Sequence, residues 1–137
     1  MSAPRDNARL VRQWVEKAEH DLRNAEHTLT LKDDCPFDTV CFHAQQCAEK
    51  YLKGLLVFFT VDFPNTHDLI LLKKLAIEAA SIKMGSADLQ TLNRYSIESR
   101  YPGEWEPITR AEAEEAVKSA RQVRDAVRSA LPATVLS

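Results

Sequence analysis

Apolar residues recur at helical spacing over long segments of this sequence, and this periodicity constrains the fold more than any other feature. Over residues 6–31 they lie three or four positions apart, which places them on one face of a helix. Asp33-Asp34-Cys35-Pro36 breaks this pattern. No segment sustains the period of two that a half-buried strand requires. The apolar stripe of this first predicted helix is Val11, Trp14, Val15, Ala18, Leu22, Ala25 and Leu29.

Four more helices are predicted from periodicity and from capping residues. The second begins at Asp38 or Thr39, both favoured N-cap residues, and ends near Phe59. Thr109 and Glu112 have the spacing of a capping box, so the last helix starts there. The third, fourth and last helices are predicted over residues 67–82, 87–99 and 109–131.

Five helices with short connections predict an all-α fold, a single-domain up-and-down helical bundle over residues 6–131. The chain of 137 residues has the length of one ordinary domain. We expect residues 1–5 and 132–137 to be flexible termini.

The composition argues against several classes of protein. The net charge is −2, whereas domains that bind nucleic acid non-specifically are basic, so only a local basic patch could hold a nucleotide or RNA. The longest apolar run covers residues 55–59, far short of the roughly 20 residues of a membrane span. The N-terminal residues lack the apolar core of a signal peptide. A cytoplasmic location is expected.

The three cysteines, Cys35, Cys41 and Cys47, predict reduced thiols rather than a disulfide framework. Their spacing matches no zinc-binding pattern, and Cys41 and Cys47 point in different directions from one helix. No metal and no cofactor is therefore expected.

The second helix has a polar stripe opposite its apolar face. At 100° per residue, its members fall within a sector of about 120°. The stripe is compatible with a solvated face in which Glu49 and Lys53 pair four residues apart. It is also compatible with a binding surface, in which the lysines contact phosphate and Phe42 stacks on a base. This polar stripe comprises Phe42, His43, Gln46, Glu49, Lys50 and Lys53.

Further polar residues stand at predicted helix ends, and each allows two interpretations. His67 could help Asp68 to cap the third helix, or it could lie beside the polar stripe. Arg100, next to Tyr101, could complement the dipole of the fourth helix or bind phosphate. His20 and His27 are expected at the surface and Trp14 in the core. No catalytic motif is present, so no catalytic residue is assigned.

The strings CFHAQQCAEKYLK (41–53), THDL (66–69) and SRYP (99–102) follow one another at a specific separation. Together with residues 14–25 and 109–116, they resemble the HEPN family (higher eukaryotes and prokaryotes nucleotide-binding domain). This resemblance covers about residues 9–131. It implies a bundle similar to the helical half of kanamycin nucleotidyltransferase, commonly a homodimer. It also implies a minimal nucleotidyltransferase as partner, in a two-component or toxin–antitoxin-like pair.

By position, the resemblance implies nucleotide binding by the polar stripe together with His67, Arg100 and Tyr101. Many relatives are ribonucleases with Arg followed, after four to six residues, by His. That motif is absent, since no histidine has an arginine at this distance upstream. The leading hypothesis is therefore a nucleotide- or RNA-binding dimer that is not an enzyme alone. The alternatives are a divergent metal-independent ribonuclease toxin and a structural dimerisation module whose stripe is the subunit interface.

Overall fold

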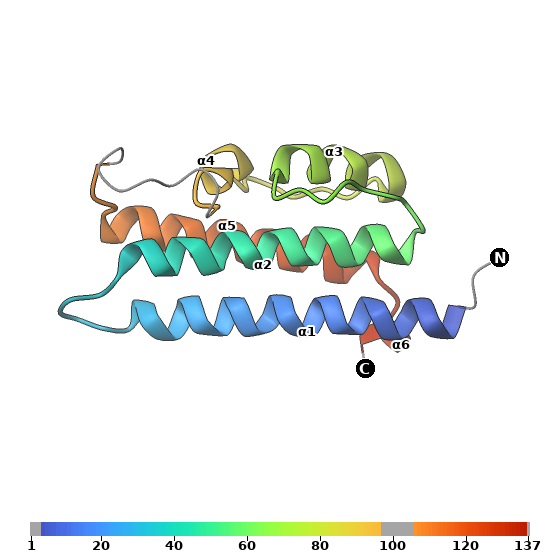
Figure 1. Cartoon of the computed structure of the whole chain (residues 1–137), viewed down its shortest axis with the longest axis horizontal. Helices are drawn as coiled ribbons and strands as arrows, with labels where there is room; N and C mark the ends of the chain where they lie inside the picture. Colours follow the sequence, from blue (N-terminus) through green and yellow to red (C-terminus); the bar gives the residue numbers. More distant parts are fainter. Residues whose placement is uncertain (1–3, 97–105, 137) are drawn as a thin grey trace.

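The computed structural model describes the backbone of residues 4–96 and 106–136, and the side chains of these residues from Asn7 onward. Within these ranges every regular element is an α-helix, which confirms the all-α prediction (Figure 1). The helices are α1 (Pro4–Leu29), α2 (Phe37–Phe58), α3 (Leu69–Ala80), α4 (Leu89–Asn93), α5 (Arg110–Ala130) and α6 (Ala133–Leu136).

The helices are arranged around α2. In Figure 1, α1, α2 and α5 run side by side along the molecule, and α3 and α4 lie on the side of α2 away from α1. The short helix α6 packs against α1. Helix α2 contacts four other helices, so one face of it is deeply buried. It also has an edge, which lies at the boundary with α1 and α3.

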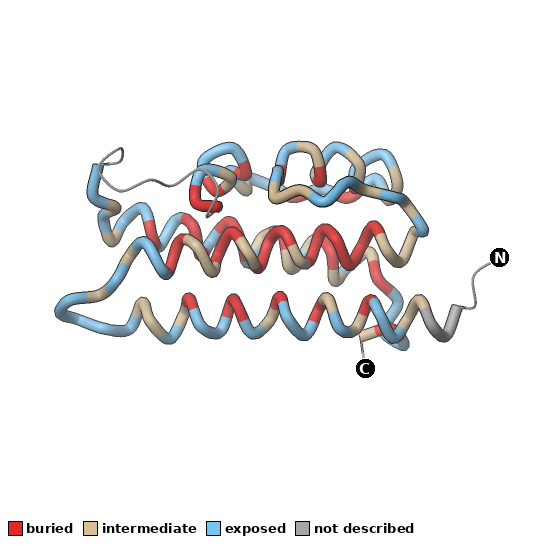
Figure 2. The backbone as a smooth tube through the Cα atoms, viewed as in Figure 1, coloured by how far each residue is buried: buried red, intermediate tan, exposed pale blue. Residues whose placement is uncertain are grey.

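The core forms where the predicted apolar stripes meet (Figure 2). In α5 and at its C-cap, the apolar residues at helical spacing are buried, namely Ala113, Ala116, Val117, Ala120, Val123, Val127 and Leu131. In α1, Val11, Val15, Ala18, Leu22 and Ala25 are buried. Trp14 was predicted to be a core residue, but it is only partly buried. Trp14 faces the edge of α2 rather than the apolar centre of that helix.

Several helix boundaries differ from the prediction. Helix α2 starts at Phe37, because the Pro36 carbonyl already accepts hydrogen bonds from the Thr39 and Val40 amides. Helix α3 starts at Leu69, and Asp68 caps it by accepting a hydrogen bond from the Ile70 amide.

Helix α4 is much shorter than predicted. It was expected over residues 87–99, but it ends at Asn93, and the chain turns so that Tyr95 is buried. The Asn93 side chain is bonded to α3, where it accepts from the Leu69 amide and donates to Asp68. These contacts come from distant residues, so the local sequence does not reveal them.

The capping box of α5 is present as predicted, with Thr109 and Glu112 bonded to each other's backbone amides. Residues 133–136, which we expected in a flexible terminus, form α6 and bury Val135. Among the described residues, no helix has the length and apolar character needed to cross a membrane.

Candidate functional site

A buried carboxylate of α1 is held by two residues of α2. Asp21 has 8% of its surface exposed. The His43 Nδ1 lies 2.8 Å from its Oδ1, and the Lys50 ammonium lies 2.5 Å from its Oδ2. His43 and Lys50 are two helical turns apart on α2, so both can reach one carboxylate.

A second buried carboxylate, Glu49, is held in the same way. It has 3% of its surface exposed. The Lys53 ammonium donates to Oε2 at 3.0 Å, and the His67 Nδ1 lies 2.9 Å from Oε1. Gln45 Nε2 also donates to Oε1, at 3.2 Å. Each carboxylate therefore binds one lysine and one histidine, as a buried charge requires.

Two glutamines connect this site to the loop before α3. Gln45 is fully buried and donates to the His67 carbonyl at 3.2 Å. Gln46 donates to the Gln45 Oε1 at 2.7 Å. We call the whole set the polar network. It comprises Asp21, His43, Gln45, Gln46, Glu49, Lys50, Lys53 and His67.

The position of His67 follows from the start of α3. Asp68 supplies the cap, so the His67 imidazole is not needed there and instead reaches Glu49 on α2. Of its two interpretations, the structure supports the one that places it beside the polar stripe.

The contacts also indicate which ring nitrogen of each histidine carries a hydrogen. A carboxylate only accepts hydrogen bonds, so the Nδ1 of His43 and of His67 must donate and must carry the hydrogen. A buried carboxylate that orients an imidazole in this way sets its tautomer and its direction.

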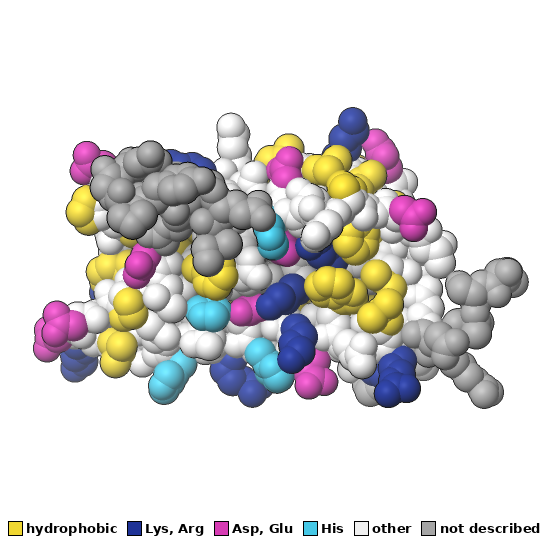
Figure 3. All heavy atoms as spheres, in the orientation of Figure 1, with side chains coloured by type: hydrophobic (Ala, Val, Ile, Leu, Met, Phe, Trp, Pro, Cys, Tyr) yellow, Lys and Arg dark blue, Asp and Glu magenta, His cyan; other side chains and the backbone are white. Residues whose placement is uncertain are grey.

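Lys53 is enclosed, whereas Lys50 and both histidines are partly open. The Lys53 ammonium lies 5.9 Å from the ring centres of Trp14 and Phe63, and the Lys53 side chain is 7% exposed. The side chains of Lys50, His43 and His67 are 25%, 23% and 32% exposed. In Figure 3, histidine, acidic and basic side chains lie next to one another in the middle of this face, with hydrophobic ones beside them.

The structure brings together all six members of the polar stripe, together with His67. Phe42 is partly buried and packs edge-on against the His43 ring, with centroids 5.4 Å apart. A fully solvated stripe is excluded, because the Glu49–Lys53 pair is buried. Arg100 and Tyr101 lie outside the described residues. His20 and His27 are exposed, as predicted.

Sequence reasoning did not assign Asp21 and Gln45 to the site. Asp21 stands three residues after Ala18 and four before Ala25, so an acid interrupts an apolar stripe. Gln45 lies on α2 at the border between its polar and apolar faces. A charged or amide side chain within an apolar stripe or at its border is the signal that could have identified Asp21 and Gln45.

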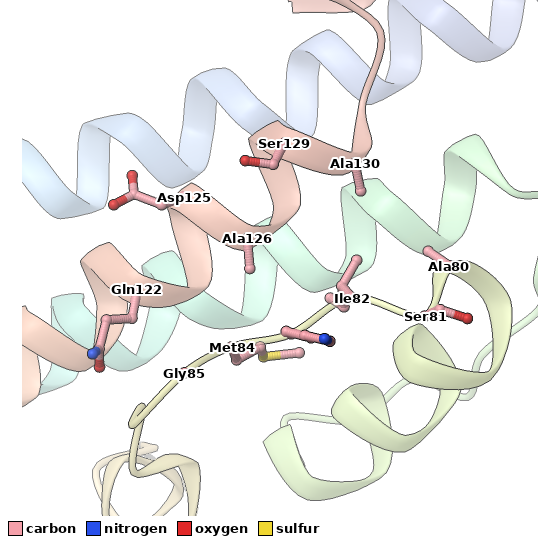
Figure 4. Close-up of a pocket in the computed structure, with 11 residues that line it drawn as sticks. Ala80, Ser81, Ile82, Met84, Gly85, Gln122, Asp125, Ala126, Ser129 and Ala130 are labelled. Carbon is pink, nitrogen blue, oxygen red and sulfur yellow. The ribbon is translucent and has the colours of Figure 1, made fainter.

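An open groove of about 570 Å³ lies elsewhere, between the chain after α3 and the C-terminal half of α5 (Figure 4). Its walls include Ile82, Met84, Gln122 and Asp125. No residue of the polar network lines this groove. Within the described parts of the chain, no group of three or more His, Cys, Asp or Glu is placed to hold a metal ion.

Comparison with known proteins decides the family. The HEPN domain family matches residues 11–130. The chain belongs to the HEPN family. A search of curated proteins finds no match.

Two solved structures are similar to this HEPN domain. TT1696 from Thermus thermophilus has a TM-score of 0.75 and 32% sequence identity, over 88% of this chain and 98% of that one. ST0689, described as an archaeal HEPN homologue, has a TM-score of 0.66 and 29% identity, over 87% of this chain and 95% of that one.

Proposed function

We propose that this HEPN domain binds the phosphate groups of a nucleotide or RNA at the exposed edge of the polar network. One observation carries the proposal. Lys50, His43 and His67 are partly open to solvent, while the buried carboxylates Asp21 and Glu49 hold them in place. Cationic and imidazole N–H donors that are fixed before binding lose little conformational entropy when an anion arrives.

In this proposal the members of the site have different roles. Lys50 contacts phosphate, and Gln46, His43 and His67 supply hydrogen bonds to phosphate, sugar or base. Phe42 stacks on a base. Glu49 and Lys53 are buried, so they position His67 rather than contact the ligand. The family resemblance adds Arg100 and Tyr101 to the ligand-binding residues.

The domain is proposed to act as a homodimer with a minimal nucleotidyltransferase, in a two-component or toxin–antitoxin-like pair. Family membership supports this assignment. Binding without cleavage is favoured, because none of the four histidines has the arginine of the ribonuclease motif.

Thermal unfolding with millimolar ATP, GTP, CTP, UTP or a short RNA tests the proposal. A ligand at 100 times its dissociation constant stabilises by about 2.7 kcal/mol, which raises Tm by several degrees. Lys50→Gln removes the charge but keeps a donor for Asp21, so it should abolish this rise. Lys83→Gln, an exposed lysine at the groove, is the matched control and should retain it.

A change in the oligomeric state would separate the alternatives. If no ligand raises Tm and Lys50→Gln instead converts a dimer to a monomer of 15.5 kDa, the polar network is a subunit interface. Metal-independent cleavage of RNA that is lost in His67→Ala would establish the ribonuclease alternative.

A further inference from the structure

Aromatic side chains stand at both ends of the polar network. Phe42 packs against His43 at one end. Trp14 and Phe63 face the Lys53 ammonium at the other end. All three rings are partly exposed. Phe63 also packs against the hydrophobic core, whereas Phe42 and Trp14 are not among the described side chains that do so.

The two ends lie on one line along α2. Residues 42 and 53 are eleven positions apart, so they project from nearly the same side of the helix, about 16 Å from each other. In a stacked strand, successive nucleotides are about 3.4 Å apart. The rise between positions 42 and 53 therefore equals nearly five stacking steps, which join about five or six nucleotides, more than a mononucleotide can span.

Positive charge lies between the aromatic ends. Lys50 lies between positions 42 and 53 of α2, about one turn before Lys53. On α1, Lys17 is three residues after Trp14 and four before Asp21, so the three residues share one side of the helix. Lys17 is exposed and forms no ion pair with any described residue. Asp21 and Glu49 are already paired with Lys50 and Lys53, whereas Lys17 has no carboxylate partner among the described residues and can contact a phosphate.

We propose that this surface binds a single-stranded nucleic acid of about five or six nucleotides, with a base stacked on Trp14 or Phe63 at one end and on Phe42 at the other. This inference rests on the proposed function. It adds an aromatic subsite at Trp14 and Phe63 and a minimum ligand length. Aromatic platforms combined with cations are typical of single-strand binding, because every base has a face that can stack.

A length series tests the inference. The affinity of uridine oligonucleotides of one, two, four, six and eight residues is measured by titration. We expect affinity to rise steeply up to about five or six nucleotides and then to level off. Equal affinity for one and for six nucleotides would overturn the inference but leave the proposed function intact. No binding at any length would also overturn the inference, and the proposed function fails with it if ATP, GTP, CTP and UTP do not raise Tm either.

Trp14 reports on its own subsite. In a Trp105→Phe background, Trp14 is the remaining tryptophan, so base stacking should quench its fluorescence with the hexanucleotide and not with the mononucleotide. Phe63→Leu, which leaves Trp14 in place, should weaken hexanucleotide binding by about 10-fold. Mononucleotide binding should be unchanged. The control Ile77→Ala truncates an exposed residue of α3 and should have no effect. Unchanged fluorescence with tight hexanucleotide binding would contradict the inference.

Discussion

Glu49 shows how one residue ties three parts of the chain together. Its two oxygens bind Lys53 and Gln45 on α2 and His67 in the loop before α3. Its side chain is 4% exposed, and that of Lys53 is 7% exposed. A carboxylate in such a place is stable only while its partners neutralise it and satisfy its hydrogen bonds.

Lys53→Met should therefore destabilise the domain by about 3–5 kcal/mol, because it leaves an unpaired buried charge. Urea unfolding measures the change. The double variant Glu49→Gln/Lys53→Met should recover a large part of the loss, since Gln still accepts bonds from His67 and Gln45. Lys74→Met on the exposed side of α3 is the control, within about 0.5 kcal/mol of wild type. A similarly small effect of Lys53→Met would show that the pair is solvated.

Cys47 gives the stability a dependence on pH. Burial raises the pKa of its thiol far above the ordinary value of 9.0, and the nearby charges of Glu19 and Asp21 act in the same direction. Above pH 9 the unfolded chain loses this proton and the folded chain keeps it, so stability falls as pH rises. Urea unfolding at pH 7.5 and pH 10 should show this fall. Cys47→Ala should reduce it, and an equal fall in the variant would exclude Cys47 as a cause.

At the scale of the elements, the close contact between α1 and α2 depends on Gly54. A Cβ added there would lie 3.0 Å from the Cβ of Trp14. That atom is next to the backbone and cannot move without the helix. The small residue at 54 therefore lets the two helices approach at the point where Trp14 meets Lys53.

Gly54→Ala has two opposing effects on the stability of the domain. Helix propensity favours Ala by about 1 kcal/mol, whereas overpacking costs about 1–3 kcal/mol. Since the clashing atom belongs to the rigid part of Trp14, we expect a net destabilisation of about 1 kcal/mol, measured as a lower midpoint in urea. Increased stability would mean that α1 and α2 can separate at no cost.

The long helices α1, α2 and α5 could be predicted from the sequence, whereas the early end of α4 and the presence of α6 could not. Helices α1, α2 and α5 have sustained apolar stripes, and the capping box of α5 marks its start. Helix α4 ends early because Asn93 bonds to α3, and the periodicity of its own sequence contains no trace of this contact. Likewise, a wheel drawn for α2 alone identified the polar stripe but not Asp21, because that partner comes from α1.

At the scale of the whole molecule, the polar network lies where α1, α2 and the loop before α3 meet. Three elements contribute its partners, so the site exists only when the bundle is assembled. The groove beside α5 is open but lacks any comparable cluster of fixed charges among its described lining residues (Figure 4). We therefore propose that the ligand binds at the network and not at the groove.

Mapping the bound ligand by NMR tests this placement most directly. Backbone amide shifts are recorded while ATP and a uridine hexanucleotide are added in turn to the intact protein. We expect the largest changes in α2 around His43 and Lys50 and in α1 around Asp21, and we expect them to disappear in Lys50→Gln. Changes confined to residues 80–85 and the C-terminal half of α5 would place the ligand in the groove and contradict binding at the polar network.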